Sequence, residues 1–345
     1  MAGESRSVQC PPMTPPTLRW FGAADVLAAM PPIDERLRLA ERTMTALAQR
    51  GASELPAKIA IHPRPEGSFA HAMPAHLRGE DVGRDLVGIK WIAGFGANAA
   101  LGLPALNAVV VLNDPETGLP IAILDGGPIT AHRTAAVTGV AIRHLGSPSN
   151  GGATSHVALI GAGAQGHAHV PVIGAVRPGS TLHLHDRHPE RTAALAEVAR
   201  ATNGIGEVLM HGTAREAIEG ADVVITAASF TSPAERQSMT NDWLRSDATI
   251  IPVDYATFCS AEVARHAALF LVDHREQFLA NRDAGNFDGY PDPVATIGEA
   301  ILAGTPRPPG RVVVTHLGVG LADIVFADVI VGAAIADGRG TTLRR

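Results

Sequence analysis

Residues 157–166 read VALIGAGAQG, and this stretch decides the fold of the chain. Its first four residues are apolar and predict a buried parallel strand, after which Gly161, Gly163 and Gly166 follow in G-x-G-x-x-G spacing. The first glycine permits a tight turn, the second leaves bare backbone beside a pyrophosphate, and the third lets the next helix pack closely on the strand. Because a lone G-x-G-x-x-G is a weak signal, the flanking residues decide its meaning.

The flanking residues are those of a dinucleotide-binding site. Ala164 and Gln165 begin the helix that follows, and the free N–H groups and positive dipole end of that helix point at a bound phosphate. A second apolar run, 181–185, precedes Asp186, whose carboxylate can accept hydrogen bonds from both ribose hydroxyls of NAD. The alternative is a glycine-rich turn that only packs an α/β sheet. Strand, loop, helix and acid together favour the dinucleotide site.

The residues after the acid bear on the choice between NAD and NADP. Asp186 favours NAD because its carboxylate would repel a 2′-phosphate. Arg187 and Arg191 follow it, and basic residues there can hold that phosphate in NADP enzymes. We expect NAD, with NADP as the alternative.

Length and composition limit the class of protein. The chain has 345 residues, 46% hydrophobic and 18% charged, which suits two domains and excludes a disordered protein. A net charge of −6 gives no overall attraction to nucleic acid or anionic lipid. Only Cys10 and Cys259 are present, so a disulfide framework is excluded and a reducing compartment is favoured. The uncharged run 91–113 contains three glycines and Pro104, so we expect a cytoplasmic protein without a membrane span.

The chain changes character near residue 150. Residues 1–16 are expected to form a flexible, proline-rich leader, and the segment 147–155 (SPSNGGATS) marks the domain boundary. Beyond it, apolar strand patterns alternate with helical patterns, which predicts a doubly wound parallel sheet with right-handed crossovers. We therefore expect 148–318 to form a Rossmann domain. At the carboxyl ends of its strands, Ala227, Ala228, Ser229 and Asp254 should lie near the glycine loop.

The part before the boundary is rich in β-structure. A helix capped by Asp34 is expected up to Leu47, followed by short strands and a hairpin around the turn 114–118. A helix over 130–145 should carry Arg133 in its first turn. The final helix is expected to return to this part. The predicted fold class is therefore α/β, with a Rossmann sheet and a β-rich α+β domain formed from 17–147 and 319–345.

Several segments, in order, resemble the ornithine cyclodeaminase and mu-crystallin family. They are PAKI at 56–59, AMPAHL at 72–77, GIKW at 88–91, VVVLNDPETGLPIAILDG at 109–126, ITAHRTAAVTGVA at 129–141 and IGAGAQ at 160–165. Their wording is nearest to the archaeal alanine dehydrogenase and siderophore-precursor amino-acid dehydrogenase branches. The resemblance implies a homodimer built through the β-rich domain, a nicotinamide cofactor on the Rossmann domain, and a small amino or imino acid between the two.

The resemblance also implies which residues bind the substrate. The family's carboxylate-binding arginine matches Arg133, its catalytic lysine matches Lys90, and a basic residue on an earlier strand matches Lys58. A guanidinium can bind a carboxylate bidentately, and an ammonium can polarise an imine or a water. Met73 is a further pocket candidate. The alternatives are a helix-end surface charge for Arg133 and a strand residue reaching solvent for Lys90.

The chain departs from the family pattern in two places. Family members with cyclodeaminase activity carry a catalytic aspartate in a G-x-D-x-P-G-K segment, where this chain has Ala256, with Asp254 two residues earlier. Asp254 is predicted to be catalytic, or else to cap a strand or contact ribose. His316 stands where the family often has F-D-S-T-G, and it either exchanges a proton near neutral pH or serves the structure. Asp323 matches a recurrent family acid and is expected on the nicotinamide side.

The predicted reaction is hydride transfer at the α-carbon of a small α-amino or α-imino acid, catalysed by an NAD(P)-dependent amino-acid dehydrogenase or ketimine reductase. A cyclodeaminase that releases ammonia and forms a cyclic imino acid such as proline is the first alternative. A non-catalytic NAD(P)-dependent binding protein of mu-crystallin type is the second, and Lys90 and Arg133 argue against it. The histidines near the first strands lack metal-ligand spacing, so no metal is expected.

Overall fold

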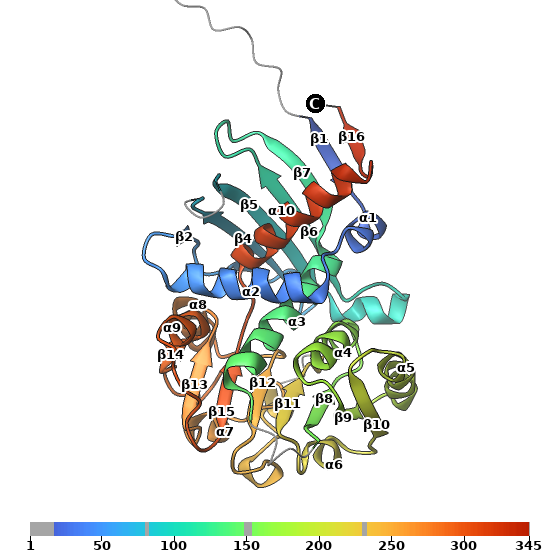
Figure 1. The fold of residues 1–345 in the computed structure, drawn as a ribbon, viewed down its shortest axis with the longest axis vertical. Helices are drawn as coiled ribbons and strands as arrows, with labels where there is room; N and C mark the ends of the chain where they lie inside the picture. Colours follow the sequence, from blue (N-terminus) through green and yellow to red (C-terminus); the bar gives the residue numbers. More distant parts are fainter. Residues whose placement is uncertain (1–16, 80–82, 148–153, 230–232, 345) are drawn as a thin grey trace, which may run out of the picture.

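The computed structural model describes residues 17–344 except 80–82, 148–153 and 230–232. Within these residues the strands form two eight-stranded sheets, and helix α3 (Gly126–Leu145) lies between them (Figure 1). The predicted leader, 1–16, and most of the predicted boundary segment, 147–155, lie outside the described residues.

The first sheet is mixed, with strand order β16-β1-β7-β6-β5-β4-β2 and β3 paired to β4. Its strands are β1 (Leu18–Phe21), β2 (Ser53–Glu54), β3 (Ile59–Ile61), β4 (Phe69–Leu77), β5 (Leu86–Gly94), β6 (Leu106–Asn113), β7 (Pro120–Asp125) and β16 (Thr341–Leu343). Strands β4 to β7 form an antiparallel meander, and β1 runs parallel to β7. The β6–β7 pair confirms the hairpin predicted around the turn 114–118.

The second sheet is parallel throughout, in the order β10-β9-β8-β11-β12-β15-β13-β14. Its strands are β8 (His156–Ile160), β9 (Ser180–His185), β10 (Ile205–Met210), β11 (Val223–Thr226), β12 (Thr249–Pro252), β13 (Leu269–Val272), β14 (Ala295–Thr296) and β15 (Val312–Thr315). The first five of these strands follow the Rossmann order, which confirms the predicted doubly wound sheet, and β15 takes the sixth position, between β12 and β13. The strand order reverses between β8 and β11, where ligands of this fold bind.

Helices cover both sheets. They are α1 (Ala23–Ala28), α2 (Ile33–Ala48), α3, α4 (Ala164–Val176), α5 (Pro189–Arg200), α6 (Ala214–Ile218), α7 (Ala261–Arg265), α8 (Arg275–Asp283), α9 (Ile297–Leu302) and α10 (Gly320–Ala336). As predicted, the last helix returns to the first sheet, where α10 packs on β4, β5 and β6 (Figure 1). In the part of the chain described, no helix has the length and apolar character needed to cross a membrane.

Two predicted helix starts were wrong. Helix α3 begins at Gly126 because the Asp125 carboxylate caps it, accepting a hydrogen bond from the backbone N–H of Gly127 at 2.9 Å. Arg133 therefore lies two turns inside the helix and not in its first turn. Helix α2 is preceded by Pro32, so Asp34 lies in its first turn and does not cap it.

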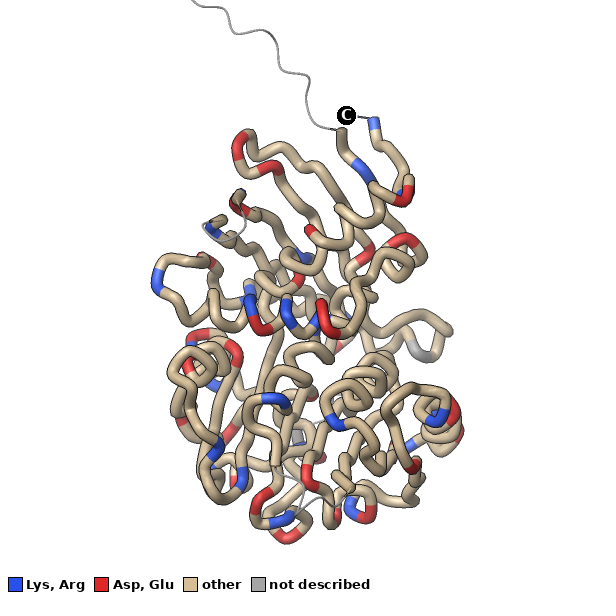
Figure 2. The backbone as a smooth tube through the Cα atoms, viewed as in Figure 1, with Lys and Arg blue, Asp and Glu red and all other residues tan. Residues whose placement is uncertain are grey.

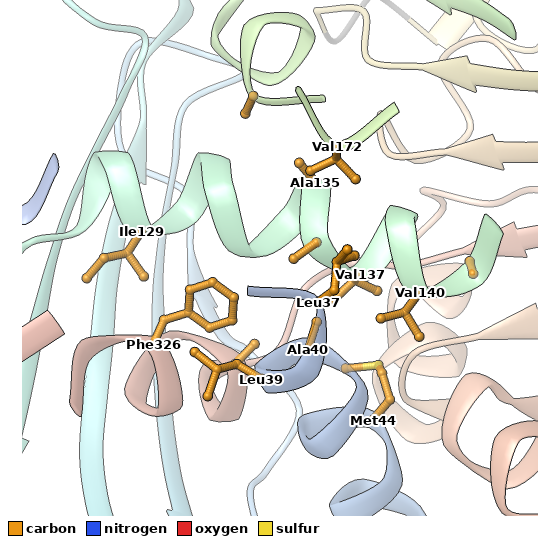
Figure 3. Packing of buried hydrophobic residues seen from close by; sticks show 14 of the residues in the cluster. Leu37, Leu39, Ala40, Met44, Ile129, Ala135, Val137, Val140, Val172 and Phe326 are labelled. Carbon is orange, nitrogen blue, oxygen red and sulfur yellow. The ribbon is translucent and has the colours of Figure 1, made fainter. Parts of the chain in front are cut away.

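One apolar cluster joins the helices of both sheets. Figure 3 shows Leu37 of α2, Val137 of α3, Val172 of α4 and Phe326 of α10 packed around α3, and each of them is at most 2% exposed. A Cβ at Gly139 would lie 2.5 Å from the Leu37 side chain and 2.6 Å from that of Val172. This glycine lets two helices approach α3 closely, and α3 is thereby held between the sheets.

Candidate active site

Three charged side chains meet in the interior, between α10, α3 and the first sheet. The Lys90 ammonium lies 2.7 Å from Asp323 Oδ2, and Arg133 Nε lies 3.2 Å from Asp323 Oδ1. Asp323 is fully buried, Lys90 is 1% exposed and Arg133 is 5% exposed. Acidic and basic residues are otherwise interspersed over the chain (Figure 2). Two cations around one buried carboxylate leave an excess of positive charge, which suits a site for an anion.

Close contacts between the backbones of β4, β5 and α10 position this cluster. Lys90 on β5 pairs with Met73 on β4, so both side chains lie on the face of the sheet that α10 covers. A Cβ at Gly320 would lie 2.3 Å from the Met73 carbonyl oxygen, so glycine is needed where α10 begins. Asp323 then lies in the first turn of α10, where the helix dipole favours a negative charge.

The Arg133 guanidinium is oriented for a second anion. Its Nε is occupied by Asp323, and its two Nη atoms would each lie 2.3 Å from a Cβ placed on Gly318, whose φ is +80°. Glycine at 318 thus gives the guanidinium its space. Among the described residues the Nη atoms donate no hydrogen bond to protein, so they can bind a carboxylate bidentately.

Lys58 directly precedes β3, and its side chain extends toward the same cluster of charges. Its Nζ donates to the Tyr255 hydroxyl at 3.1 Å and to the Leu317 carbonyl, which leaves its third N–H for a ligand. The residue is partly exposed, but its ammonium is enclosed, and this burial lowers the pKa of Lys58 to about 8. Asp273 raises that pKa and Arg133 lowers it further.

The pKa of Lys90 also lies near neutral pH. Burial lowers the pKa of Lys90 to about 7, although the neighbouring Asp323 raises it and Arg133 lowers it. A lysine that titrates near neutral pH can both bind an acid and exchange a proton. The structure therefore brings together Lys58, Lys90, Arg133 and Met73, all four predicted for the substrate site, whose roles stay predictions.

Two neighbours of this site were not predicted. Asp273 follows β13, and its Oδ2 accepts a hydrogen bond at 2.7 Å from the backbone N–H of Gly318, which holds the loop against Arg133. An acid directly after a buried apolar run was the available signal. His71 on β4 was considered only as a metal ligand. Burial, with Lys58 next, lowers the pKa of His71 to about 4, so it is neutral beside the cations.

The glycine loop has the geometry that each glycine implies. Gly161 has φ +107°, and a Cβ there would lie 2.4 Å from the Ala227 carbonyl oxygen. A Cβ at Gly163 would meet nothing within 4 Å, so the backbone there is open to a ligand. A Cβ at Gly166 would lie 2.3 Å from the Gly161 carbonyl oxygen, so this glycine allows close helix–strand packing. Helix α4 then begins with Ala164 and Gln165.

Asp186 stands at the end of β9, beside this loop. Its carboxylate accepts hydrogen bonds from the backbone N–H of Ala162 at 2.8 Å and of His188 at 2.9 Å. Two lone-pair positions remain, and the residue is partly exposed, so ribose hydroxyls can reach it. Arg187 follows and is exposed. These residues fit an adenosine ribose.

Asp254 follows β12 and lies at the same edge of the second sheet. It is 3% exposed, and it accepts hydrogen bonds from Thr226 Oγ1 at 2.9 Å and from the backbone N–H of Ala228 at 3.0 Å. Burial raises the pKa of Asp254 to about 7, although these hydrogen bonds lower it. The contacts hold the segment that contains Ala227, Ala228 and the exposed Ser229. The catalytic role of Asp254 stays a prediction beside this observed positioning role.

His316 and Asp323 both lie near the cations of the substrate site. Asp323 lies with the cations of the substrate site, so its contact with the cofactor stays a prediction. Burial, and Arg133 after it, holds the pKa of His316 far below its usual range. The imidazole is therefore neutral near pH 7, and whether His316 takes part in binding or serves the structure stays a prediction. No cluster of His, Cys, Asp and Glu suited to a metal ion occurs among the residues that the structure describes.

The chain is similar to known proteins over most of its length. The model of the ornithine cyclodeaminase/mu-crystallin family matches residues 28–336. The nodulation efficiency protein NfeD of Rhizobium meliloti is 32% identical over 94% of this chain and 98% of its own length, and the ketimine reductase mu-crystallin of Mus musculus is 28% identical over 76% and 79%.

A solved structure has the same fold. The Δ1-pyrroline-2-carboxylate reductase of Thermococcus litoralis, in complex with NADH and L-proline, superposes with a TM-score of 0.80 over 94% of this chain and 100% of that one, at 24% identity. The family match over most of the chain shows that the chain belongs to the ornithine cyclodeaminase/mu-crystallin family.

Proposed function

We propose that this protein is an NAD(P)-dependent ketimine reductase or amino-acid dehydrogenase that acts on a small α-imino or α-amino acid. The observation that carries the proposal is the Arg133 guanidinium, whose Nε is held by Asp323 while its Nη atoms are free of protein partners among the described residues. A relative across three quarters of the chain bears the name ketimine reductase, which supports the same reaction.

The residues present fit a nicotinamide dinucleotide. Gly163 offers open backbone, α4 directs its N-terminus at the phosphate position, and Asp186 stands where ribose would lie. We assign 148–318 as the cofactor domain, and 17–147 with 319–345 as the substrate and dimerisation domain. NAD is the expected cofactor because the Asp186 carboxylate disfavours a 2′-phosphate.

Each cation has a defined task in this reaction. Arg133 and Lys58 bind the carboxylate of the substrate, which fixes the neighbouring carbon in one position. The reduced cofactor, when bound, supplies a hydride to that carbon, and the electron pair of the C=N bond moves to nitrogen. Lys90, protonated below pH 7, stabilises the carboxylate and can exchange a proton with the substrate nitrogen. Burial of the three cations excludes water, which strengthens their interaction with the substrate.

Substrate turnover tests this proposal. Purified protein with NADH and Δ1-pyrroline-2-carboxylate should oxidise NADH and form proline, and NADPH should serve less well. Arg133→Ala should raise KM at least about tenfold, because a charge-assisted bidentate contact is lost, and leave the Kd for NADH unchanged. Arg143→Ala, on the exposed end of the same helix, is the matched control.

Other outcomes would contradict the proposal. NADH binding without turnover of any cyclic or ammonia-derived imine would favour a binding protein. Release of ammonia from L-ornithine would favour a cyclodeaminase. The buried Ala256 replaces the acid that the cyclodeaminase pattern carries at this position, so we expect no ammonia.

A homodimer completes the proposal, and the outer face of the first sheet supports it. Ile59 on β3, Trp91 on β5 and Val109 on β6 share this face through the registers of their strands, opposite the face that α10 covers. Ile59 is 58% exposed and Trp91 43%. An apolar sheet face that the helices of the described residues leave uncovered suits a second copy of the sheet.

Sedimentation measures the assembly. The protein should sediment as a dimer, and Trp91→Glu should shift it toward monomers, because a charge is then buried in the contact. Val198→Glu on the exposed face of α5 is the control. A wild-type monomer at all concentrations would contradict the dimer.

We place the protein in the cytoplasm, where reduced dinucleotide and thiols are maintained. Cys259 is a free, buried thiol. Recovery of the protein in a secreted fraction would contradict this placement.

A further inference from the structure

A chain of hydrogen bonds connects the substrate site to the helix that faces the cofactor phosphates. His316 Nε2 lies 3.0 Å from Thr138 Oγ1, and the same hydroxyl oxygen lies 2.9 Å from His169 Nε2. His169 Nδ1 lies 2.7 Å from the Gln165 carbonyl oxygen in the first turn of α4. His316, Thr138 and His169 are all at most 3% exposed, so water does not compete for these contacts.

The direction of every hydrogen bond in this chain is determined. A carbonyl oxygen only accepts, so His169 Nδ1 carries a proton, and burial lowers the pKa of His169 to about 4, which leaves its Nε2 bare. The Thr138 hydroxyl therefore donates to His169. Since a hydroxyl has one proton, its oxygen must accept from His316, which places the proton of His316 on Nε2.

This assignment leaves His316 Nδ1 as a bare acceptor. The ring is neutral, and Nδ1 is buried without a hydrogen-bond partner within the described part of the chain. Buried acceptors without a donor are rare, because desolvation is then uncompensated. Since Thr138 holds the ring through Nε2, the unpaired Nδ1 indicates that a ligand supplies the missing donor.

The position of His316 identifies that ligand. The next residues, Leu317 and Gly318, contact the Lys58 ammonium and the Arg133 guanidinium respectively. Arg133 and Lys58 also lower the pKa of His316, so both cations lie near its ring. Two cations there bind a carboxylate, and a bare nitrogen beside them suits an N–H close to that carboxylate.

We infer that His316 Nδ1 accepts a hydrogen bond from the N–H of the substrate, with Thr138 and His169 as positioning residues that hold the tautomer. This inference rests on the proposed function and narrows it. The site takes acids whose α-carbon bears a protonated imine or an amine, and it discriminates against acids with oxygen at that position, whose lone pairs face the bare Nδ1. Since Gln165 lies in the first turn of α4, the helix that faces the phosphates also orients the ring that binds the substrate N–H.

Calorimetry on the protein with NAD⁺ bound tests the discrimination. L-Proline and tetrahydrofuran-2-carboxylate differ by a ring N–H against a ring oxygen. The wild type should bind L-proline about 10- to 100-fold more tightly, the range for one charge-assisted hydrogen bond. His316→Gln keeps an amide near the Nε2 position but removes the acceptor, so the preference should fall to within about threefold of unity. His316→Asn, which places a carbonyl near the Nδ1 position, should restore most of it.

The positioning residues are tested by the same preference. Thr138→Val should reduce the preference although its side chain does not touch the ligand, and Thr138→Ser should restore it. His144→Gln, at the half-exposed end of α3, is the matched control and should change nothing. An unchanged preference in His316→Gln, or in Thr138→Val, would overturn the inference.

The tautomer is measured without any ligand. In ¹⁵N-histidine-labelled protein, His316 should show a protonated Nε2 and an unprotonated Nδ1, and the Nδ1 resonance should move upfield when L-proline binds. A proton on Nδ1 would overturn the inference. An unprotonated Nδ1 would also overturn it if the protein bound neither L-proline nor tetrahydrofuran-2-carboxylate. NADH oxidation with the cyclic imine then shows separately whether the proposed function survives.

Discussion

The Lys90 ammonium lies 2.7 Å from the Asp323 carboxylate, and neither side chain is more than 1% exposed. The pair joins β5 to α10, which are far apart in sequence, and Arg133 shares the same carboxylate. This carboxylate keeps two cations in place before any substrate enters. In the proposed reaction, the carboxylate of the substrate completes the charge balance of the cluster.

Asp323→Asn should destabilise the fold strongly. The substitution leaves two buried cations without a counter-charge, which costs about 3–5 kcal/mol of unfolding free energy. Asp328 lies on the same helix, α10, and forms a more exposed ion pair with Arg84. Asp328→Asn breaks this pair and should cost less than about 1 kcal/mol. Urea unfolding measures both. Equal losses would show that the buried cluster is held by other contacts.

The pH dependence of KM should report Lys58. Its pKa of about 8 means that it is cationic below pH 8 and neutral above, so carboxylate binding weakens as pH rises. KM should increase up to about tenfold between pH 7 and pH 9. Lys58→Met should have a raised KM at pH 7 without this component, while titration of the imine itself remains in both. An identical profile in the variant would remove Lys58 from carboxylate binding.

Gly318→Ala should impair substrate binding through Arg133. Its Cβ would lie 2.3 Å from both Nη atoms, so the guanidinium must move, and KM should rise about tenfold or more. Gly338→Ala has a similar backbone cost, since its φ is +68°, but its Cβ meets nothing within 4 Å. Both should lose about 1–2 kcal/mol of stability. If both variants keep the wild-type KM, Gly318 does not position Arg133.

Asp254→Asn separates a positioning role from a catalytic one. The carboxylate receives two hydrogen bonds from the segment beside the glycine loop, and an amide can accept only one of them with its single oxygen. A positioning role predicts a several-fold higher Kd for NADH and an almost unchanged kcat at saturating NADH. A fall of about 100-fold or more in kcat would establish Asp254 as an acid–base catalyst.

Local patterns were sufficient to predict the cofactor side of this protein. The three glycines, the helix start at Ala164 and the acid at Asp186 lie within thirty residues of one another, and each has a direct backbone cause. The alternation of apolar strands and helices likewise predicted the parallel sheet. The site roles of Lys90 and Arg133 were predicted from motifs that resemble the family and not from residue spacing.

The remaining features depend on contacts between distant segments. The contact of Asp323 with Lys90 depends on the approach of α10 to β4, which Gly320 permits. The start of α3 at Gly126 depends on the cap that Asp125 provides. Asp125 is also the last residue of β7, so the strand passes directly into the helix. The hydrogen bonds of His316 join three elements, so periodicity in one segment could not reveal them.

The transfer of deuterium from NADH tests the central claim most directly. Protein supplied with NADH deuterated at C4 of the nicotinamide, on the transferred face, and with Δ1-pyrroline-2-carboxylate should yield proline that is one mass unit heavier, with the label on the α-carbon. Unlabelled proline, or no oxidation of NADH while the imine persists, would contradict the proposed hydride transfer to the carbon beside the substrate carboxylate.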